Sequence, residues 1–352
     1  MPHVSRNSGI AVITLDQFHK GVTTFRKAPD QEQRAAIDTA YNNGLFIVAG
    51  PGSGKTTCLT LRVLKMILVD GVAPSGVIAT TFTKKAAEEL RSRILGWGFN
   101  LIDALKADAG IPRKIRDRVA EIDINQVWTG TLDSLCEQIL RDHRVPGEQP
   151  PVLADEFVSK TLMMRKGLLD GRKDQEPDLS TLLADLWGGT WGLHAAKKGE
   201  LLTSLWERRH QDLVDWPNWV QSAPSGQLQA RLLIDSALSG YAAELQKRNI
   251  VDFATVEYSV LERLQAGRLQ PWLEGLRVIL VDEYQDTNLL QEKIYFQIAK
   301  AVKGALTVVG DDDQSLYRFR GATVDLFRDF EKRYQKQFKA APAKVYLSKN
   351  YR

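Results

Sequence analysis

One segment near the N-terminus constrains the fold of this chain more than any other. An apolar run, Leu45–Ala49, leads into Gly-Pro-Gly-Ser-Gly-Lys-Thr-Thr at positions 50–57, and a helical pattern follows over 59–68. A buried strand, a glycine-rich turn and a helix start are the context of a Walker A loop. The glycines let backbone N–H groups close around phosphate oxygens, and the helix N-terminus adds its dipole. The alternative, a glycine-rich turn that only connects a strand to a helix, is disfavoured by the flanking elements.

The side chains of this loop fit the chemistry of ATP. Lys55 would contact the β- and γ-phosphates, and the Thr56 hydroxyl would bind Mg²⁺. We therefore predict ATP and Mg²⁺ as cofactors. The predicted nucleotide-binding residues of the loop are Gly50, Gly52, Ser53, Gly54, Lys55, Thr56 and Thr57.

A second apolar run, Val278–Val281, ends in two adjacent carboxylates, Asp282 and Glu283. Ligands of open α/β sheets bind at the carboxyl ends of the strands, where this pair would lie. Asp282 can hold Mg²⁺, directly or through water, and Glu283 can orient and deprotonate the attacking water. An acidic pair alone is usually just solvated. The long separation of the pair from Lys55 predicts a sizeable insertion between the two motifs.

Short β-branched runs alternate with helical patterns along much of the chain. This alternation predicts an α/β fold with a parallel sheet and helices on both faces. From about Asp142 to Ile250 the strand signal gives way to charged, leucine-rich helical sequence, which predicts an inserted all-helical subdomain. The predicted strands are 45–49, 77–82, 127–131, 277–282, 306–310 and 344–347. The predicted parts are an N-terminal extension (1–24), an ATPase domain in two pieces (25–142 and 251–352) and the insertion (143–250).

The composition excludes several other classes of protein. The chain has 43% hydrophobic and 26% charged residues, which is typical of a soluble globular protein. No apolar run approaches the ~20 residues of a membrane span, and the polar N-terminus lacks a signal-peptide core. Cys58 and Cys136 have no C-x-x-C spacing, so neither zinc nor a disulfide framework is indicated. We expect a cytoplasmic protein without a membrane partner. The net charge of +4 permits a polyanionic partner.

The predicted insertion is rich in tryptophan, with basic residues between the rings. This mixture permits a nucleic-acid surface, but a helical core with solvated charges is the favoured interpretation. The tryptophans are Trp187, Trp191, Trp206, Trp216 and Trp219, and the basic residues are Lys197, Lys198, Arg208 and Arg209.

A string of motifs, in order, resembles the UvrD/Rep/PcrA group of superfamily 1 DNA helicases. The similar segments are 29–37 (Q motif), 50–57 (Walker A), 79–91 (motif Ia), 128–135 (motif Ib), 251–254 (an Asp-Phe element), 282–288 (motif II), 309–322 (motif III) and 347–352 (motif IV). Two departures stand out. Leu132-Asp133 replaces the usual Phe-His of motif Ib, and Phe319 replaces the usual tryptophan of motif III.

The resemblance implies a RecA-like fold for the sheet domain and a role for each matching residue. Gln33 would read the adenine edge, Tyr351 would stack on the base, and Arg352 would act as an arginine finger. Gln314 would sense the γ-phosphate. Stacking on unstacked bases suits a translocase because every base has a π-face. The implied DNA-binding residues are Phe82, Thr83, Thr131, Tyr317, Phe319 and Arg320. Phe82 and Phe319 could instead be core residues.

The resemblance also implies an activity, namely ATP-dependent 3′–5′ helicase or translocase function on single-stranded DNA or a duplex with a single-stranded tail. The family continues into a second RecA-like domain with motifs V and VI. We expect the 352 residues to be an N-terminal ATP-binding half of low activity, either as the first part of the enzyme or as one half of a split enzyme with the second RecA-like domain on another chain. The alternatives are a nucleotide-gated DNA-binding or regulatory module without motor activity, and an ATPase subunit completed by a partner chain.

Overall fold

A computed structural model describes residues 13–144, 147, 149–187, 194–311 and 324–351. The chain divides into two compact units. The first unit comprises Met1–Leu132, Gly267–Thr287 and Tyr295–Arg352, and the second comprises Asp133–Ala266 and Asn288–Ile294.

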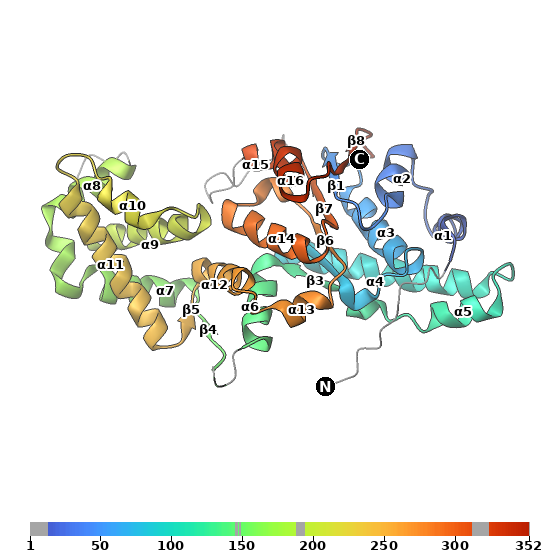
Figure 1. Ribbon diagram of the computed structural model, residues 1–352, viewed down its shortest axis with the longest axis horizontal. Helices are drawn as coiled ribbons and strands as arrows, with labels where there is room; N and C mark the ends of the chain where they lie inside the picture. Colours follow the sequence, from blue (N-terminus) through green and yellow to red (C-terminus); the bar gives the residue numbers. More distant parts are fainter. Residues whose placement is uncertain (1–12, 145–146, 148, 188–193, 312–323, 352) are drawn as a thin grey trace. The chain divides into compact units, whose positions relative to one another are not determined.

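The first unit is built on a six-stranded sheet in which each strand pairs in parallel with its neighbours (Figure 1). The strand order is β3-β2-β6-β7-β1-β8. The strands are β1 (Leu45–Ala49), β2 (Val77–Thr81), β3 (Trp128–Thr131), β6 (Val278–Val281), β7 (Leu306–Gly310) and β8 (Ala343–Leu347). This sheet confirms the predicted α/β fold and is consistent with a RecA-like domain.

Helices cover both faces of the sheet. Connections between parallel strands are right-handed, so a change in the direction of travel across the sheet moves the helices to the other face. The chain runs from β1 through β2 to β3 in one direction, and from β6 through β7 to β8 in the other. The helices of this unit are α1 (Leu15–Val22), α2 (Gln31–Asp38), α3 (Lys55–Leu68), α4 (Lys84–Ala107), α5 (Arg113–Ala120), α13 (Gln270–Glu274), α15 (Val324–Arg328) and α16 (Phe330–Phe338), with part of α14 (Leu289–Ala301).

Side-chain contacts agree with this placement of the helices. Arg62 of α3 bonds to Thr307 of β7, while Phe46 of β1 packs against Phe330 of α16. Phe46 is in register with Val308, the residue after Thr307, and successive strand residues point to opposite faces. The α16 face carries a cluster of aromatic rings, which are Phe46, Tyr284, Phe296, Phe327, Phe330, Tyr334 and Phe338.

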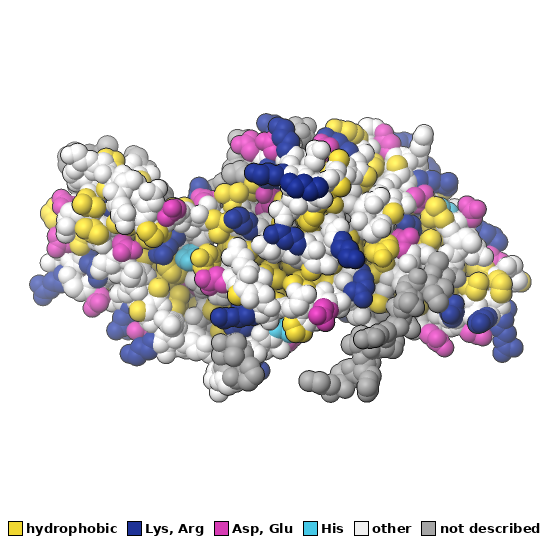
Figure 2. Space-filling model, in the orientation of Figure 1, with side chains coloured by type: hydrophobic (Ala, Val, Ile, Leu, Met, Phe, Trp, Pro, Cys, Tyr) yellow, Lys and Arg dark blue, Asp and Glu magenta, His cyan; other side chains and the backbone are white. Residues whose placement is uncertain are grey.

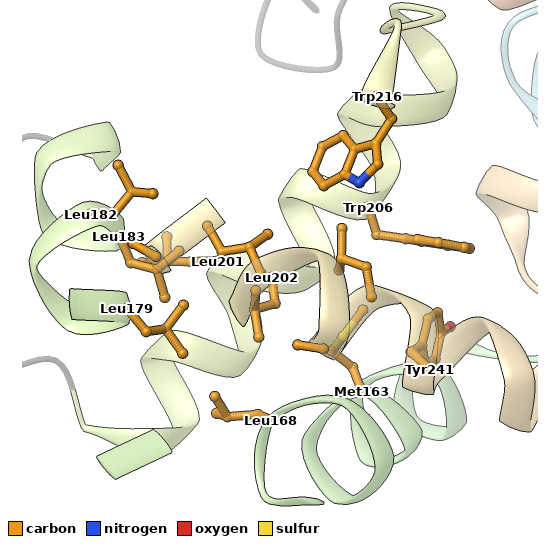
Figure 3. Packing of buried hydrophobic residues seen from close by; sticks show 14 of the residues in the cluster. Met163, Leu168, Leu179, Leu182, Leu183, Leu201, Leu202, Trp206, Trp216 and Tyr241 are labelled. Atoms are coloured by element: carbon orange, nitrogen blue, oxygen red, sulfur yellow. The ribbon is translucent and has the colours of Figure 1, made fainter. Parts of the chain in front are cut away.

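The second unit is helical, with its own buried core. Figure 3 shows Leu179, Leu183 and Leu202 pointing to the same interior as Met163 and Tyr241. The prediction of an all-helical insertion needs one correction, because β4 (Val152–Leu153) and β5 (Ile250–Val251) pair in parallel. The helices are α6 (Leu132–Asp142), α7 (Glu156–Leu162), α8 (Pro177–Trp187), α9 (Ala195–Gln211), α10 (Trp216–Gln221), α11 (Leu228–Lys247) and α12 (Phe253–Gln265), together with the start of α14.

Asp252, in the predicted Asp-Phe element, organises this core. The buried carboxylate accepts hydrogen bonds from Trp206 Nε1 of α9 (2.8 Å) and from the Tyr241 hydroxyl of α11 (2.7 Å). Asp252 also caps α12 by accepting from Thr255 N (2.8 Å). One buried carboxylate thus holds three helices together. In the described part of the chain, no helix is long and apolar enough to cross a membrane.

Candidate nucleotide-binding site

Three strands end at one edge of the sheet in the first unit. β7 lies between β1 and β6, and all three strands are parallel. The loops after β1, β6 and β7 therefore leave from the same edge, where α/β sheets bind their ligands. Lys55 Nζ and Glu283 Oε2, 228 positions apart in the sequence, lie 3.5 Å from each other. The two halves of the site predicted from sequence are thus adjacent.

The glycine-rich loop has the backbone expected of a phosphate cradle. Gly52 (φ 73°) and Gly54 (φ 88°) are left-handed, a conformation that strains other residues. Ser53 is buried and its Oγ donates to the Gly50 carbonyl at 2.7 Å, which closes the turn. Gly54 is the N-cap of α3, and no side chain caps this helix. The first N–H groups of α3 therefore remain for a phosphate.

The carboxylate pair after β6 is held in a strained conformation. Glu283 has φ 53° and ψ 42°, in the left-handed region that costs non-glycine residues of order 1–3 kcal/mol. Its N–H donates to Asp282 Oδ1 (3.0 Å), and its carboxylate accepts from Gln285 Nε2 (2.7 Å) as well as from Lys55. Gln285 in turn accepts from the N–H of Asp311 (3.1 Å), just after β7. Backbone strain of this kind persists only where surrounding bonds hold it, and strained residues cluster at functional sites.

Gln285 was not among the predicted site residues, although it lies inside the motif II segment. It is buried, and it connects Glu283 to the end of β7. Its position two residues after Glu283 is a signal only in retrospect, because many glutamines near acidic residues are exposed.

Negative charge in this site exceeds positive charge. Burial, with a further contribution from the neighbouring Glu283, raises the pKa of Asp282 to about 7 against the opposing effect of Lys55. Burial and Glu283, opposed by Lys55, likewise raise the pKa of Asp286 to about 6. Asp286 Oδ1 is buried and accepts no hydrogen bond from the described residues. The lysine is thus outnumbered by three carboxylates.

This donor set fits a bound Mg²⁺. Oxygen ligands suit a hard cation, and the unsatisfied Asp286 Oδ1 indicates a deficit of positive charge or donors. Within the described residues, no cluster of three or more His, Cys, Asp or Glu could hold a metal by itself. Protein-bound Mg²⁺ normally uses only one or two carboxylates, with phosphates and water completing its coordination. Thr56 and Asp282 remain the residues proposed to hold it.

Gln33 and Tyr351, predicted to contact the adenine, both lie against the loop. Gln33 Nε2 donates to the Ser53 carbonyl (3.4 Å), and Tyr351 N donates to the Gly52 carbonyl (3.0 Å). The Tyr351 hydroxyl donates to the Asp30 carboxylate. The side-chain oxygen of Gln33, Oε1, also accepts from Asp30 N (3.3 Å), which completes a capping box at the start of α2. Adenine recognition by Gln33 would have to compete with these bonds.

Arg62 supports this region, and it was not predicted from the sequence. It is fully buried in α3 and donates to the carbonyls of Ala36 (2.9 Å) and Thr39 (2.7 Å) at the C-terminal end of α2, as well as to Thr307 Oγ1 (3.0 Å). Burial lowers the pKa of Arg62 to about 10, and Asp70 and Asp38 oppose the shift. The arginine ties the helix of Gln33 to the helix that follows the phosphate loop.

The residues predicted to contact DNA are only partly within the described structure. Phe82 is half-buried after β2, exposed Thr83 caps α4 by accepting from Ala86 N (3.2 Å), and Thr131 is buried at the end of β3. β2 and β3 are paired, so these residues share one sheet edge. Basic and acidic side chains are interspersed over the described residues that Figure 2 shows. Gln314, Tyr317, Phe319, Arg320 and Arg352 lie outside the described residues.

A left-handed glycine loop before an uncapped helix, beside carboxylates on a parallel sheet, defines a P-loop nucleotide-binding protein. The chain belongs to the UvrD/REP helicase family, because the model of the family's N-terminal domain matches residues 29–335. Nucleotide and DNA binding are the properties that membership in this family implies.

Relatives of known activity are similar to nearly the whole chain. The ATP-dependent DNA helicase SRS2 of Saccharomyces cerevisiae is 28% identical over 339 residues, covering 91% of this chain and 25% of the relative. UvrD1 of Mycobacterium tuberculosis, also an ATP-dependent DNA helicase, is 28% identical over 330 residues (91% and 37%). DNA helicase II of Haemophilus influenzae is 29% identical over 325 residues (92% and 38%). The chain thus spans well under half the length of these relatives.

Proposed function

We propose that this chain binds Mg·ATP and hydrolyses it in response to single-stranded DNA, as the ATP-binding part of a 3′–5′ DNA helicase or translocase. The observation that carries the proposal is the contact between Lys55 and Glu283, which joins the phosphate loop to the catalytic carboxylate. The direction of movement rests on the resemblance to the UvrD/Rep/PcrA group, and a cytoplasmic location is part of the same proposal.

The residues of the site divide the chemistry as follows. The N–H groups of the loop and of α3 hold the phosphates, and Lys55 contacts the β- and γ-phosphates. Bound Mg²⁺, held by Thr56 and Asp282, supplies charge neutralisation on the transferred phosphoryl group. Glu283 accepts the proton of the attacking water. Gln285 keeps the Glu283 carboxylate aimed and connects it to Asp311.

The contact through Gln285 suggests how DNA would control hydrolysis. Asp311 directly precedes the segment that contains Gln314, Tyr317 and Phe319, which the resemblance assigns to γ-phosphate sensing and DNA contact. DNA binding that alters the position of Asp311 N would change the donor to Gln285 and so the orientation of the Glu283 carboxylate. This coupling is a proposal, supported by the two hydrogen bonds of Gln285.

The test is ATP hydrolysis with and without an oligo(dT) strand, followed by strand separation of duplexes with a 3′ or a 5′ tail. Both are measured for the 352 residues alone and with a second RecA-like domain supplied in trans or by fusion. We expect slow turnover without unwinding from the 352 residues alone, and DNA-stimulated turnover with unwinding from the 3′ tail once the second domain is supplied. Glu283→Gln is the matched control, because it keeps the side-chain size but removes the base, which typically costs about 10²–10⁴ in rate. ATP binding without DNA-stimulated turnover, even with the second domain supplied, would favour the alternative, a nucleotide-gated DNA-binding module.

A further inference from the structure

The second unit contains a cavity of about 370 Å³ whose lining residues all belong to that unit. It is formed by the end of α9, the turn into α10, one side of α12 and the first turns of α14. Its polar and aromatic lining residues include Arg209, His210, Asp215, Trp216, Tyr258 and Lys293. The volume is within the range of small-molecule sites. None of these residues takes part in the ATP site proposed above.

Two stacked aromatic rings lie between two cations beside the cavity, and Arg209 and Trp216 of this stack line it. The Arg209 guanidinium lies 4.9 Å from the ring centre of Trp216, which stacks on Trp219 at 4.5 Å and 23°. The Arg231 guanidinium lies 4.4 Å from the centre of the Trp219 ring. Trp216, also seen in Figure 3, is buried, and its Nε1 donates to Asp235 (2.8 Å). The rings of Trp216 and Trp206 thus contact Arg209, while the Asp235 carboxylate attracts it without forming an ion pair.

The cavity has unpaired positive charge. The side chains of half-buried Arg209 and exposed Lys293 form no hydrogen bond or ion pair with any residue that the structure describes. The one lining carboxylate, Asp215, caps α10 by accepting from Asn218 N. Asp235 bonds to Trp216 Nε1, as above. An anion would thus find two cations whose donors are not used within the described structure.

His210 adds an acceptor to this wall. Its Nδ1 lies 2.8 Å from the Trp206 carbonyl, and a carbonyl can only accept, so Nδ1 carries the proton. Burial lowers the pKa of His210, which keeps the ring neutral. The remaining ring nitrogen, Nε2, is then an acceptor that selects an N–H or O–H donor on a ligand. Tyr258, edge-on to His210 at 5.1 Å, adds an aromatic surface to the cavity.

We propose that this cavity is a second nucleotide site, separate from the Walker A loop, which takes one phosphate and one base. Lys293 and Arg209 would bind the phosphate, since lysine acts as a point charge and arginine as a fork of donors. The base would lie against Tyr258, because aromatic rings stack bases. A base N–H would donate to His210 Nε2. The nucleotide is either a free mononucleotide or one unit of a single strand, and the strand source rests on the proposed function.

Photo-cross-linking tests the site directly. The probes are 5-iodo-dUMP, for a free mononucleotide, and an oligo(dT) strand carrying one 5-iodouracil. We expect illumination to attach the base to Tyr258 or Trp216, as mapped by peptide mass spectrometry. Lys293→Ala should lower the apparent affinity at least about tenfold, because a charge contact to phosphate is lost. The matched control is Lys300→Ala, an exposed lysine about 10 Å further along α14 that does not line the cavity.

The outcomes separate the site from the proposed function. Cross-linking by 5-iodo-dUMP that survives Lys55→Ala supports a free-nucleotide site, and cross-linking by the oligonucleotide alone supports a strand site. An oligonucleotide that binds equally well to the Lys293→Ala and Lys300→Ala variants, with no adduct in the cavity, overturns the site but not DNA binding. Mononucleotide cross-linking without any oligonucleotide binding supports the site while contradicting the proposed helicase function. With no adduct from either probe, the cationic stack is only a structural feature of the core.

Discussion

Asp282→Asn should stabilise this protein above neutral pH, although it alters a residue proposed to bind Mg²⁺. Asp282 is buried at the end of β6, beside Glu283, and these surroundings raise its pKa from 3.8 to about 7. Each pH unit corresponds to about 1.4 kcal/mol, so about three units amount to roughly 4 kcal/mol as an upper value. Asparagine has nearly the same size, and its amide oxygen can still accept the hydrogen bond from Glu283 N.

The direction of the pH dependence follows from the protons that the folded and unfolded states bind. In the unfolded chain Asp282 loses its proton near pH 3.8, whereas in the folded chain it keeps the proton until about pH 7. The folded state thus binds more protons between these values, and the free energy of unfolding falls as pH rises through this window. Asp282→Asn removes this loss. The variant should match the wild type near pH 4 and exceed it by up to a few kcal/mol above pH 7.

The assay is thermal and urea unfolding at several pH values between 4 and 8, without nucleotide or Mg²⁺. Asp117→Asn, at an exposed position of α5, controls for the loss of one negative charge. Adding Mg·ATP analogue should reverse the order, because the wild type gains the metal contact and the variant does not. Parallel pH profiles for the wild type and Asp282→Asn would show that Asp282 is not a buried charge beside Glu283, and the reasoning on the metal site would fail with it.

Three further predictions address the phosphate loop, the structural role of Arg62 and the binding of DNA. Lys55→Ala should lower the affinity for a fluorescent ATP analogue at least about tenfold, since a charged hydrogen bond contributes about 1.5–3 kcal/mol; unchanged binding would contradict the loop assignment. Arg62→Met should destabilise the fold by about 3 kcal/mol in urea unfolding, because buried carbonyls of α2 lose their donor; a neutral effect would mean that water replaces the guanidinium. Phe319→Ala should weaken single-strand binding by about 1–3 kcal/mol for any base sequence, as measured by anisotropy, whereas a lowered melting temperature with normal binding would identify Phe319 as a core residue.

The strands were predictable because the sheet is buried on both faces. A buried parallel strand has a nearly continuous apolar sequence, so the runs at 45–49 and 306–310 correspond to β1 and β7 without adjustment. At β2 and β6 the predicted runs extend one or two residues further than the strands, because polar and turn residues at the ends have no periodic signal. The order of the strands was not predictable from these runs, since it depends on crossovers that the sequence does not mark.

The missed residues share a different cause. Arg62 lies in an apolar helix, where the sequence pattern alone indicates an exposed or snorkelling cation, yet it is the donor for the end of α2. Asp252 was noted only as part of a motif, whereas it bonds to side chains of α9 and α11. In both cases the function of a buried polar group depends on which backbone and side-chain groups are brought to it. That information exists only in the folded chain.

The contact that identifies the site also indicates what ATP must change. Lys55 donates to Glu283 across 3.5 Å, and the Glu283 side chain is 33% exposed. A pair with this length and exposure contributes at most about 1 kcal/mol, so phosphate oxygens would compete successfully for the ammonium group. Once Lys55 has turned to the phosphates, Glu283 keeps only its hydrogen bond from Gln285, with one carboxylate oxygen left for water. The left-handed backbone of Glu283 supports this interpretation, because a residue held under strain by two side-chain bonds is ready to move when one of them is lost.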